Sequence, residues 1–307
     1  MGVNVVYGFK RFSAIGLFML GCAAPVASAD LGGMERPLVE EPIAASPEWT
    51  FKFTSYGWLP WMSGNSVVRG RSLDVQVDPT QILTHLDWST LPVWMSYMEA
   101  RHGPVMLFND IVYSALSGST GFAKSVGNPI VGATLGANVS VDYVQATIEF
   151  GGAYEVWTGR NPVTPGLTAF DLLAGGRYWH QELNASADLA TTVNVGGLTV
   201  SGGRVFARSG SVDWVDPFVG GRIRNQVMPG QELVVRGDVG GFGAGSEFSW
   251  QVLATYNMQL CTTAGYVIDS YVGYRALSVD YSQGAGNSRY EYNVLQQGPV
   301  IGATLHF

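Results

Sequence analysis

The segment from Glu247 to Leu260 alternates between apolar and polar residues. One set of alternate positions is apolar, and the other is polar apart from Leu253; the apolar set is Phe248, Trp250, Val252, Ala254, Tyr256, Met258 and Leu260. Successive side chains of a β-strand point to opposite faces, so this period of two predicts a strand with one apolar and one polar face. Residues 145–154, 170–178 and 232–239 show related patterns. A register slip of one residue would carry their charged side chains to the apolar face.

The composition indicates which solvent the apolar faces meet. Apolar residues make up 47% of the chain, yet no run after residue 29 approaches the roughly 20 apolar residues that a membrane helix needs. Only 13% of the residues are charged, against about 25% in an average soluble domain. A soluble β-sandwich is the alternative, but it would need a more charged exterior. The sequence therefore predicts an all-β protein, a single transmembrane antiparallel β-barrel in which lipid-facing and lumen-facing residues alternate.

The N-terminus predicts export. Lys10 and Arg11 precede an apolar run, and Ala27-Ser28-Ala29 then offers a cleavage site, so residues 1–29 are predicted to be a signal peptide. A lipoprotein signal that ends at Cys22 is the alternative, although the residues before Cys22 match such a signal poorly. Residues 30–48 show no periodicity and predict a periplasmic leader, which leaves 49–307 as the barrel.

Short and long connections alternate along the barrel region. The short connections are 101–104, 159–166, 228–230 and 261–264, and the long ones are 62–90, 118–137, 181–210 and 282–289, with one brief exception at 243–245. Outer-membrane barrels combine short periplasmic turns with longer extracellular loops. The pattern predicts about ten strands, with eight or twelve as alternatives. Within the first long connection, Asp78 followed by Pro79 predicts a short capped helix over 78–86.

Aromatic residues gather near the ends of the predicted strands, where they would form two interfacial girdles. The loop-side set is Trp58, Trp61, Trp94, Tyr178, Trp179, Trp214 and Trp250, and the turn-side set is Tyr154, Trp157 and Tyr266. One segment disturbs this scheme, because Asn109 falls on the face that would otherwise meet lipid.

The C-terminal segment from Val300 to Phe307 alternates and ends on an aromatic residue. It resembles the terminal-strand signal that the bacterial barrel-assembly machinery reads, with Phe307 as the assembly signal. Across nearly the whole mature chain the pattern resembles small proteobacterial outer-membrane barrels of the porin-like or OmpA-like class. Residues 56–60, 171–179 and 236–243 resemble an uncharacterised family of such barrels. The resemblance implies a Gram-negative outer-membrane location, with outer-membrane lipid and the assembly machinery as partners, and it implies no activity.

Charged residues of both signs fall on the predicted inward faces. The predicted lumen network comprises Arg177, Arg222, Arg224, Arg236, Arg275, Asp171, Asp216, Glu149, Asp238 and Asp269. The same faces also carry Lys52, Glu99, Arg101, Asp110 and Glu232. Eight strands enclose just enough room for side chains, whereas 16 or more leave an aqueous channel, so about ten strands predict a largely plugged lumen. The preferred function is a non-enzymatic structural or surface-interaction barrel, with a narrow porin-like channel as the alternative.

Other functions find less support in the sequence. The net charge of −7 argues against a nucleic-acid partner. No metal-ligand spacing, phosphate loop, nucleophile elbow or dinucleotide fingerprint follows residue 29, so neither cofactor nor catalytic residue is predicted. An outer-rim hydrolase stays open through His180 or His85 as a general base near Asp213 or Ser211. A transporter of hydrophobic ligands also stays open, and no extracellular ligand is predicted.

Overall fold

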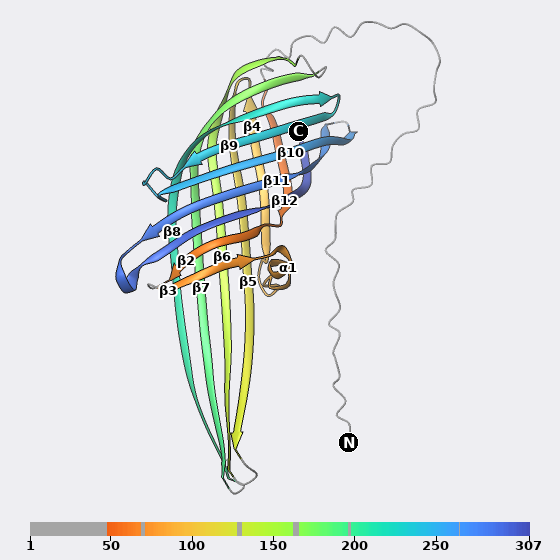
Figure 1. The fold of residues 1–307 in the computed structure, drawn as a ribbon. Helices are drawn as coiled ribbons and strands as arrows, with labels where there is room; N and C mark the ends of the chain where they lie inside the picture. The colour runs from red at the N-terminus through yellow and green to blue at the C-terminus, as the bar shows by residue number, and fades with distance from the viewer. Residues whose placement is uncertain (1–47, 69–70, 128–130, 162–165, 196–197, 264) are drawn as a thin grey trace, which may run out of the picture. The chain divides into compact units, whose positions relative to one another are not determined.

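The computed structural model describes residues 48–68, 71–127, 131–161, 166–195, 198–263 and 265–307. The predicted signal peptide, Cys22 and nearly all of the predicted leader lie outside the described residues. Ten strands form the ring seen in Figure 1: β1 (Thr50–Trp58), β4 (Val93–His102), β5 (Val105–Gly127), β6 (Val131–Arg160), β7 (Leu167–Val195), β8 (Leu198–Met228), β9 (Gln231–Gly240), β10 (Phe248–Thr263), β11 (Tyr266–Gln283) and β12 (Tyr290–His306). β2 (Trp61–Val68), β3 (Arg71–Val77), the helix α1 (Pro79–Thr84) and a 3-10 turn at Gly286–Ser288 complete the described elements.

Pairing between the first and last strands closes the ring. β1 pairs with β4 on one side and with β12 on the other, where Lys52 lies opposite His306. All neighbouring strands are antiparallel, and the closed ten-stranded barrel confirms the predicted fold class. β2 continues along β12, and β3 pairs with β2, so these two strands lie outside the ring. We call the end with the short connections and the closing residue Phe307 the turn end, and the opposite end the loop end.

The predicted helix is present as α1. Asp78 caps it, because its carboxylate accepts hydrogen bonds from the backbone N–H groups of Thr80 (2.8 Å) and Gln81 (2.9 Å). The side chain of Gln81 accepts in return from the backbone N–H of Asp78 (2.9 Å), which completes a capping box. Among the described residues, no helix has the length and apolar character needed to cross a membrane.

Four strands continue far beyond the ring, contrary to the predicted loops at 118–137 and 181–210. β5, β6, β7 and β8 contain 23, 30, 29 and 31 residues, and they pair with one another as far as Gly127 opposite Gly132 and Val195 opposite Leu198. A rise of about 3.3 Å per residue makes β8 roughly 100 Å long, whereas a membrane strand needs only about 9–11 residues. We call this extension the projecting sheet (Figure 1). Residues 118–137 and 181–210 are rich in Gly, Ser and Ala, which are common in loops. In the structure, however, β6 and β7 pair with a neighbouring strand on both sides, so their backbone N–H and C=O groups have hydrogen-bond partners.

The outer wall of the ring is apolar. Val252, Leu172 and Ile301 point outward and are 45%, 51% and 62% exposed, while alternate residues on the same strands are buried inside. On β10 the outward apolar row runs from Phe248 to Leu260. With a strand tilt of about 40°, this row covers roughly 30 Å along the barrel axis. That height is close to the apolar band of about 25 Å in outer-membrane barrels.

The outward face becomes polar at the loop end. Along β6 the outward residues change from Val144 to Asp142, and along β8 they change from Val215 to Asp213. Asp142 lies opposite Asn184 of β7, which is also outward and polar. The outward faces of neighbouring strands therefore change from apolar to polar at a similar level. We call the apolar part of the outer wall the apolar belt, and this change marks its limit at the loop end.

The predicted aromatic girdle is wrong for three tryptophans. Trp58, Trp179 and Trp214 point into the barrel and are 3%, 0% and 6% exposed, whereas Trp61 and Trp94 are about half exposed. Position along a strand determines the level of a side chain, but odd or even position determines its face. Trp179 follows Arg177 by two residues and therefore shares its inward face.

Asn109 points outward, and the structure accounts for its polar side chain. Its amide Nδ2 donates to the backbone carbonyl of Glu149 on the neighbouring strand (2.8 Å). The donor is thus satisfied within the wall, which lowers the cost of an amide on an apolar surface.

The wall is interrupted between β1 and β4. Their pairing runs from Thr50 opposite Arg101 only as far as Ser55 opposite Ser96. Above that level the backbone N–H of Trp58 donates to the sulfur of Met95 (3.0 Å) instead of to a carbonyl. β2 stays with β12 while β4 stays with β5, so the two edges part toward the loop end. We call this interruption the seam.

Candidate functional site in the barrel lumen

The middle of the lumen holds a balanced group of six charged residues, which we call the central cluster. Its three arginines are Arg177, Arg236 and Arg275, and its three carboxylates are Asp110, Glu149 and Asp238. They come from β5, β6, β7, β9 and β11, so five of the ten ring strands contribute. All six side chains are almost completely buried. Such burial is tolerable because every charge has a partner of opposite sign.

Glu149 is the hub of the central cluster. Its carboxylate accepts from Arg177 Nε (2.9 Å), Arg236 Nη2 (2.7 Å) and Arg275 Nη2 (3.1 Å). Arg177 also donates to Asp238 (2.7 Å) and Arg275 to Asp110 (2.8 Å). The hydroxyl of Tyr56 donates to Asp110 (2.6 Å), and Gln251 accepts from Arg275 Nε (2.7 Å). These bonds join both walls of the barrel across its axis.

Aromatic rings complete the packing of the arginines. Arg177 lies 5.1 Å from the ring centre of Phe218, and Arg236 lies 5.0 Å from that of Phe108. Both phenylalanines extend over glycines. A Cβ on Gly151 would lie 2.9 Å from Phe108, and a Cβ on Gly175 would lie 2.8 Å from Phe218. The glycines therefore make room for rings that face the guanidinium groups, an arrangement that favours a cation over an aromatic face.

A second balanced group lies nearer the turn end, and we call it the turn-side cluster. It consists of Arg101, Arg222, Arg224, Glu99, Glu155 and Asp171. Asp171 is fully buried and contacts all three arginines, with Arg222 Nε at 2.9 Å and Arg224 Nε at 3.0 Å. Arg222 also donates to Glu99 (2.8 Å). The two clusters together fill one side of the lumen at two successive levels.

An apolar layer closes the lumen on the loop side of the central cluster. Trp179 and Trp214 stack with ring centres 5.4 Å apart, and Tyr281 stacks on Trp214 at 4.0 Å. Leu277, Val279, Val294 and other buried residues pack around this stack. The inside of the barrel thus holds the charged clusters toward the turn end and this aromatic layer toward the loop end, where the buried side chains of Gln145, Gln181 and Gln296 also lie.

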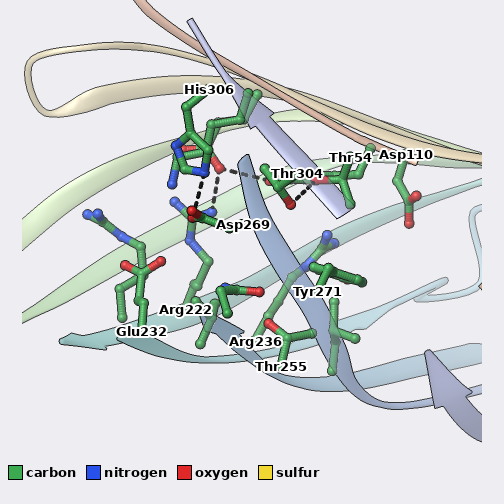
Figure 2. Close-up of a pocket in the computed structure, with 17 residues that line it drawn as sticks. Thr54, Asp110, Arg222, Glu232, Arg236, Thr255, Asp269, Tyr271, Thr304 and His306 are labelled. Carbon is green, nitrogen blue, oxygen red and sulfur yellow. Dashed lines mark hydrogen bonds and ion pairs between the residues drawn. The ribbon is translucent and has the colours of Figure 1, made fainter. Parts of the chain in front are cut away.

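A cavity of about 80 Å³ remains on the turn side, between the two clusters and the strands β9 to β12 and β1 (Figure 2). Arg236 and Asp110 of the central cluster and Arg222 and Arg224 of the turn-side cluster form part of its lining. The opposite lining includes Lys52, Thr54, Glu232, Thr255, Asn257, Asp269, Tyr271, Thr304 and His306. This volume accommodates several water molecules.

The structure brings together eight of the ten residues of the predicted network. Arg177, Arg236, Arg275, Glu149 and Asp238 meet in the central cluster, and Arg222, Arg224 and Asp171 meet in the turn-side cluster. Asp216 is buried but accepts from the backbone N–H of Ser246 (2.6 Å) and forms no ion pair with a described arginine. Asp269 lies 2.8 Å from His306 at the cavity.

Sequence reasoning missed Glu155, Tyr56 and Gln251. Glu155 has the same odd parity as the inward Glu149 and keeps a regular register up to Asp171, but the predicted inward row on this strand ended at Glu149. Tyr56 and Gln251 are uncharged, so a search for ionisable inward residues passed over them. In each case the alternation along the preceding residues would have predicted an inward side chain.

The candidate general bases lie elsewhere. His180 Nδ1 lies 2.7 Å from Asp213 Oδ1, and the hydroxyl of Tyr178 donates to the same oxygen (2.5 Å), all on the outward face. In the described part of the chain, Ser211 shows no hydrogen bond to His180. His85 Nδ1 contacts the carbonyl of Gln81 (2.8 Å). Among the described residues, no group of three or more His, Cys, Asp or Glu side chains is arranged to hold a metal ion.

The fold and lumen define a closed antiparallel barrel with an apolar outer wall and charged clusters in its interior. No protein-family model matches the chain, and no curated protein matches it. Among solved structures, the chain is similar to a FadL homologue from Pseudomonas aeruginosa, with 8% identity over 84% of this chain and 89% of that chain and a TM-score of 0.24. It is also similar to the P. putida toluene transporter TodX, with 9% identity, the same coverages and a TM-score of 0.21. Both TM-scores are below 0.5, so the functional assignment rests on the geometry of this chain.

Proposed function

We propose that this chain is an integral outer-membrane β-barrel of a Gram-negative bacterium with a closed lumen, and that it acts through its loop-end surface as a structural or surface-interaction protein. The observation that carries this proposal is the central cluster. Glu149 and Arg177 have no solvent exposure, and they lie in the middle of the lumen with paired charges on every side. The proposal includes neither an enzymatic activity nor a cofactor.

The membrane placement follows from the outer wall. Apart from the seam, each strand of the closed ring pairs with a neighbour on both sides, and a closed barrel is the form in which strands can cross hydrocarbon. The apolar belt has the height of a bilayer core, and the change from Val215 to Asp213 limits it at the loop end. The short turns then lie in the periplasm and the projecting sheet outside the cell. Phe307 pairs with Phe51 through both backbone hydrogen bonds (2.9 and 3.0 Å), as expected for a closing strand that the assembly machinery recognises.

Two exposed positions test this orientation. Ser209 lies on the outward face of the projecting sheet, and Met228 lies at the turn end and is 55% exposed. In intact cells, a membrane-impermeant maleimide should label a Ser209→Cys variant and should not label a Met228→Cys variant. Labelling of Met228→Cys alone would reverse the proposed orientation, and equal labelling of both variants in intact cells would contradict the membrane placement.

The closed lumen has its own test. A conducting path through the centre would have to separate buried arginine–carboxylate pairs, and leaving such a charge without its partner costs about 3–5 kcal/mol. Purified protein in a planar lipid bilayer should therefore show no discrete conductance steps. Steps in the unmodified protein would favour the alternative, a narrow channel for small solutes.

The seam favours a second candidate function, the passage of small hydrophobic molecules between the loop-end lumen and the bilayer. The ladder between β1 and β4 stops at Ser55 and Ser96, and Trp58 of the apolar layer lies just above that point. A disulfide between Gly57→Cys and Trp94→Cys, which would pair if the ladder continued, should close the seam. Uptake of a hydrophobic fluorescent probe should fall on oxidation and recover on reduction. Equal uptake in both states would remove this candidate.

A further inference from the structure

Two charged residues of the cavity form no ion pair among the described residues, although Lys52 interacts at longer range with Glu99, and Glu232 with Arg224. The arginines of the lining pair with carboxylates, and Asp269 pairs with His306. In contrast, no oppositely charged side chain of the described residues lies within ion-pair distance of Lys52 or of Glu232, although both line the cavity. Lys52 belongs to β1 and Glu232 to β9, which three strands separate along the shorter way around the ring. A cation and an anion that form no ion pair thus line one cavity from well-separated parts of its wall.

Glu232 belongs to a row of acceptors. Asn257 of β10 lies opposite Glu232 of β9 in the strand register. Asp269 of β11 lies opposite Gln259, which follows Asn257 by two residues on β10. Asn257 Oδ1 and Asp269 Oδ1 are both buried, and neither has a hydrogen-bond partner among the described residues. Buried acceptors without donors are costly. One wall of the cavity therefore presents two buried acceptors without donors, Asn257 Oδ1 and Asp269 Oδ1, next to the carboxylate of Glu232.

Lys52 presents the complementary chemistry. Its ammonium group supplies up to three donors and a positive charge, and the turn-side arginines beside it already have their own carboxylates. Water could satisfy the acceptors but would leave both charges without an opposite charge in direct contact. A small molecule that carries both charges would satisfy all of these groups. The cavity of about 80 Å³ has room for several water molecules, and a small amino acid takes up a similar space.

We propose that this cavity binds a small zwitterion, with its ammonium group on Glu232, Asn257 and Asp269 and its carboxylate on Lys52. The site opens on the turn-end half of the lumen, and the closed centre of the barrel separates it from the loop end. It is thus a binding site, independent of whether the barrel transports anything. Figure 2 labels Glu232 and Asp269 among the residues that line this cavity.

Calorimetric titration of the purified, detergent-solubilised protein tests the proposal. The probes are glycine, β-alanine and 4-aminobutyrate, whose charges lie at increasing separation, with methylammonium and acetate as singly charged probes. At least one zwitterion should bind saturably, and more tightly than either singly charged probe. Lys52→Met and Glu232→Gln should each weaken that binding at least tenfold. Glu247→Gln, which changes an exposed carboxylate at the loop end, is the matched control and should leave it unchanged.

Several outcomes would overturn the proposal. They are no saturable binding of any zwitterion, binding of acetate as tight as that of the best zwitterion, and binding that survives both Lys52→Met and Glu232→Gln. The melting temperature of each variant establishes that it is folded before titration. Because Glu232→Gln keeps the size of the side chain and removes only its charge, a folded Glu232→Gln variant that binds as the unmodified protein does would also contradict the assignment.

Discussion

Replacement of Glu149 by alanine should destabilise the barrel strongly. The variant leaves three buried arginines facing two carboxylates, Asp110 and Asp238, so one positive charge in the centre of the lumen loses its counter-charge. The three arginine hydrogen bonds to Glu149 are charge-assisted, and at about 1.5–3 kcal/mol each they set an upper limit. Arg177, Arg236 and Arg275 keep their other partners, and water can enter the space left by the side chain. The expected loss is therefore the smaller value of about 3–5 kcal/mol found when one partner of a buried ion pair is removed.

Urea unfolding in phospholipid vesicles, followed by tryptophan fluorescence, measures this loss. The exposed carboxylate Glu247 provides the control, since Glu247→Ala should change the free energy of unfolding by no more than about 0.5 kcal/mol. A double variant, Glu149→Met with Arg236→Met, keeps the cluster balanced and should recover much of the stability. A loss below about 1 kcal/mol for Glu149→Ala would mean that Glu149 is hydrated, and the closed lumen would then be wrong.

Three further predictions address the belt, the packing and the helix. Val252→Arg, in the middle of the apolar belt, should cost about 2–4 kcal/mol in the same unfolding assay, whereas Ser209→Arg on the projecting sheet should cost almost nothing; equal effects would contradict the membrane placement. Gly151→Ala places a Cβ 2.4 Å from the carbonyl of Ala174 and should cost about 1–3 kcal/mol, while Gly210→Ala meets nothing within 4 Å and should be neutral to within about 0.5 kcal/mol. The hydroxyl of Thr80 and the backbone N–H of Gln81 hold the pKa of Asp78 below its usual value. The helix cap that Asp78 forms is therefore complete above about pH 4 and is lost as the pH falls through the lowered pKa. The protection of the Ile82 amide against hydrogen exchange should decrease on acidification and in an Asp78→Ala variant. Protection that does not depend on pH would refute the role of this cap.

Alternation predicted much of this structure because it is a local property. Each inward arginine of the clusters could be identified from its neighbours on the same strand, as Arg236 and Asp238 were from Val235 and Val239. The ten-stranded ring followed from the spacing of the turns. The cap at Asp78 followed from Pro79 at the first helical position. All of these features depend on residues close together in the sequence.

The pairing of charges could not be predicted, because it depends on the register and stagger around the ring. Arg275 and Asp110 are 165 residues apart, and nothing near either one identifies the other. Trp179 was assigned to the outside because its level was read without its face. The length of β5 to β8 was hidden by residues that are common in loops, and Glu155 was missed because the inward row was followed only as far as Glu149. The charge pairing and the strand lengths are arrangements that form only when distant strands meet.

The origin of the central cluster on five different strands has a consequence for how the barrel forms. Until β11 joins the ring, Arg275 is absent from the centre, and the carboxylates of β5 and β6 lack one of their three counter-charges. An unfinished barrel thus carries an electrostatic penalty that disappears only when β11 brings Arg275 into the centre. Charge neutrality in the interior would then act as a check on complete assembly: a chain that ends before β11 should accumulate as an open intermediate instead of a smaller barrel.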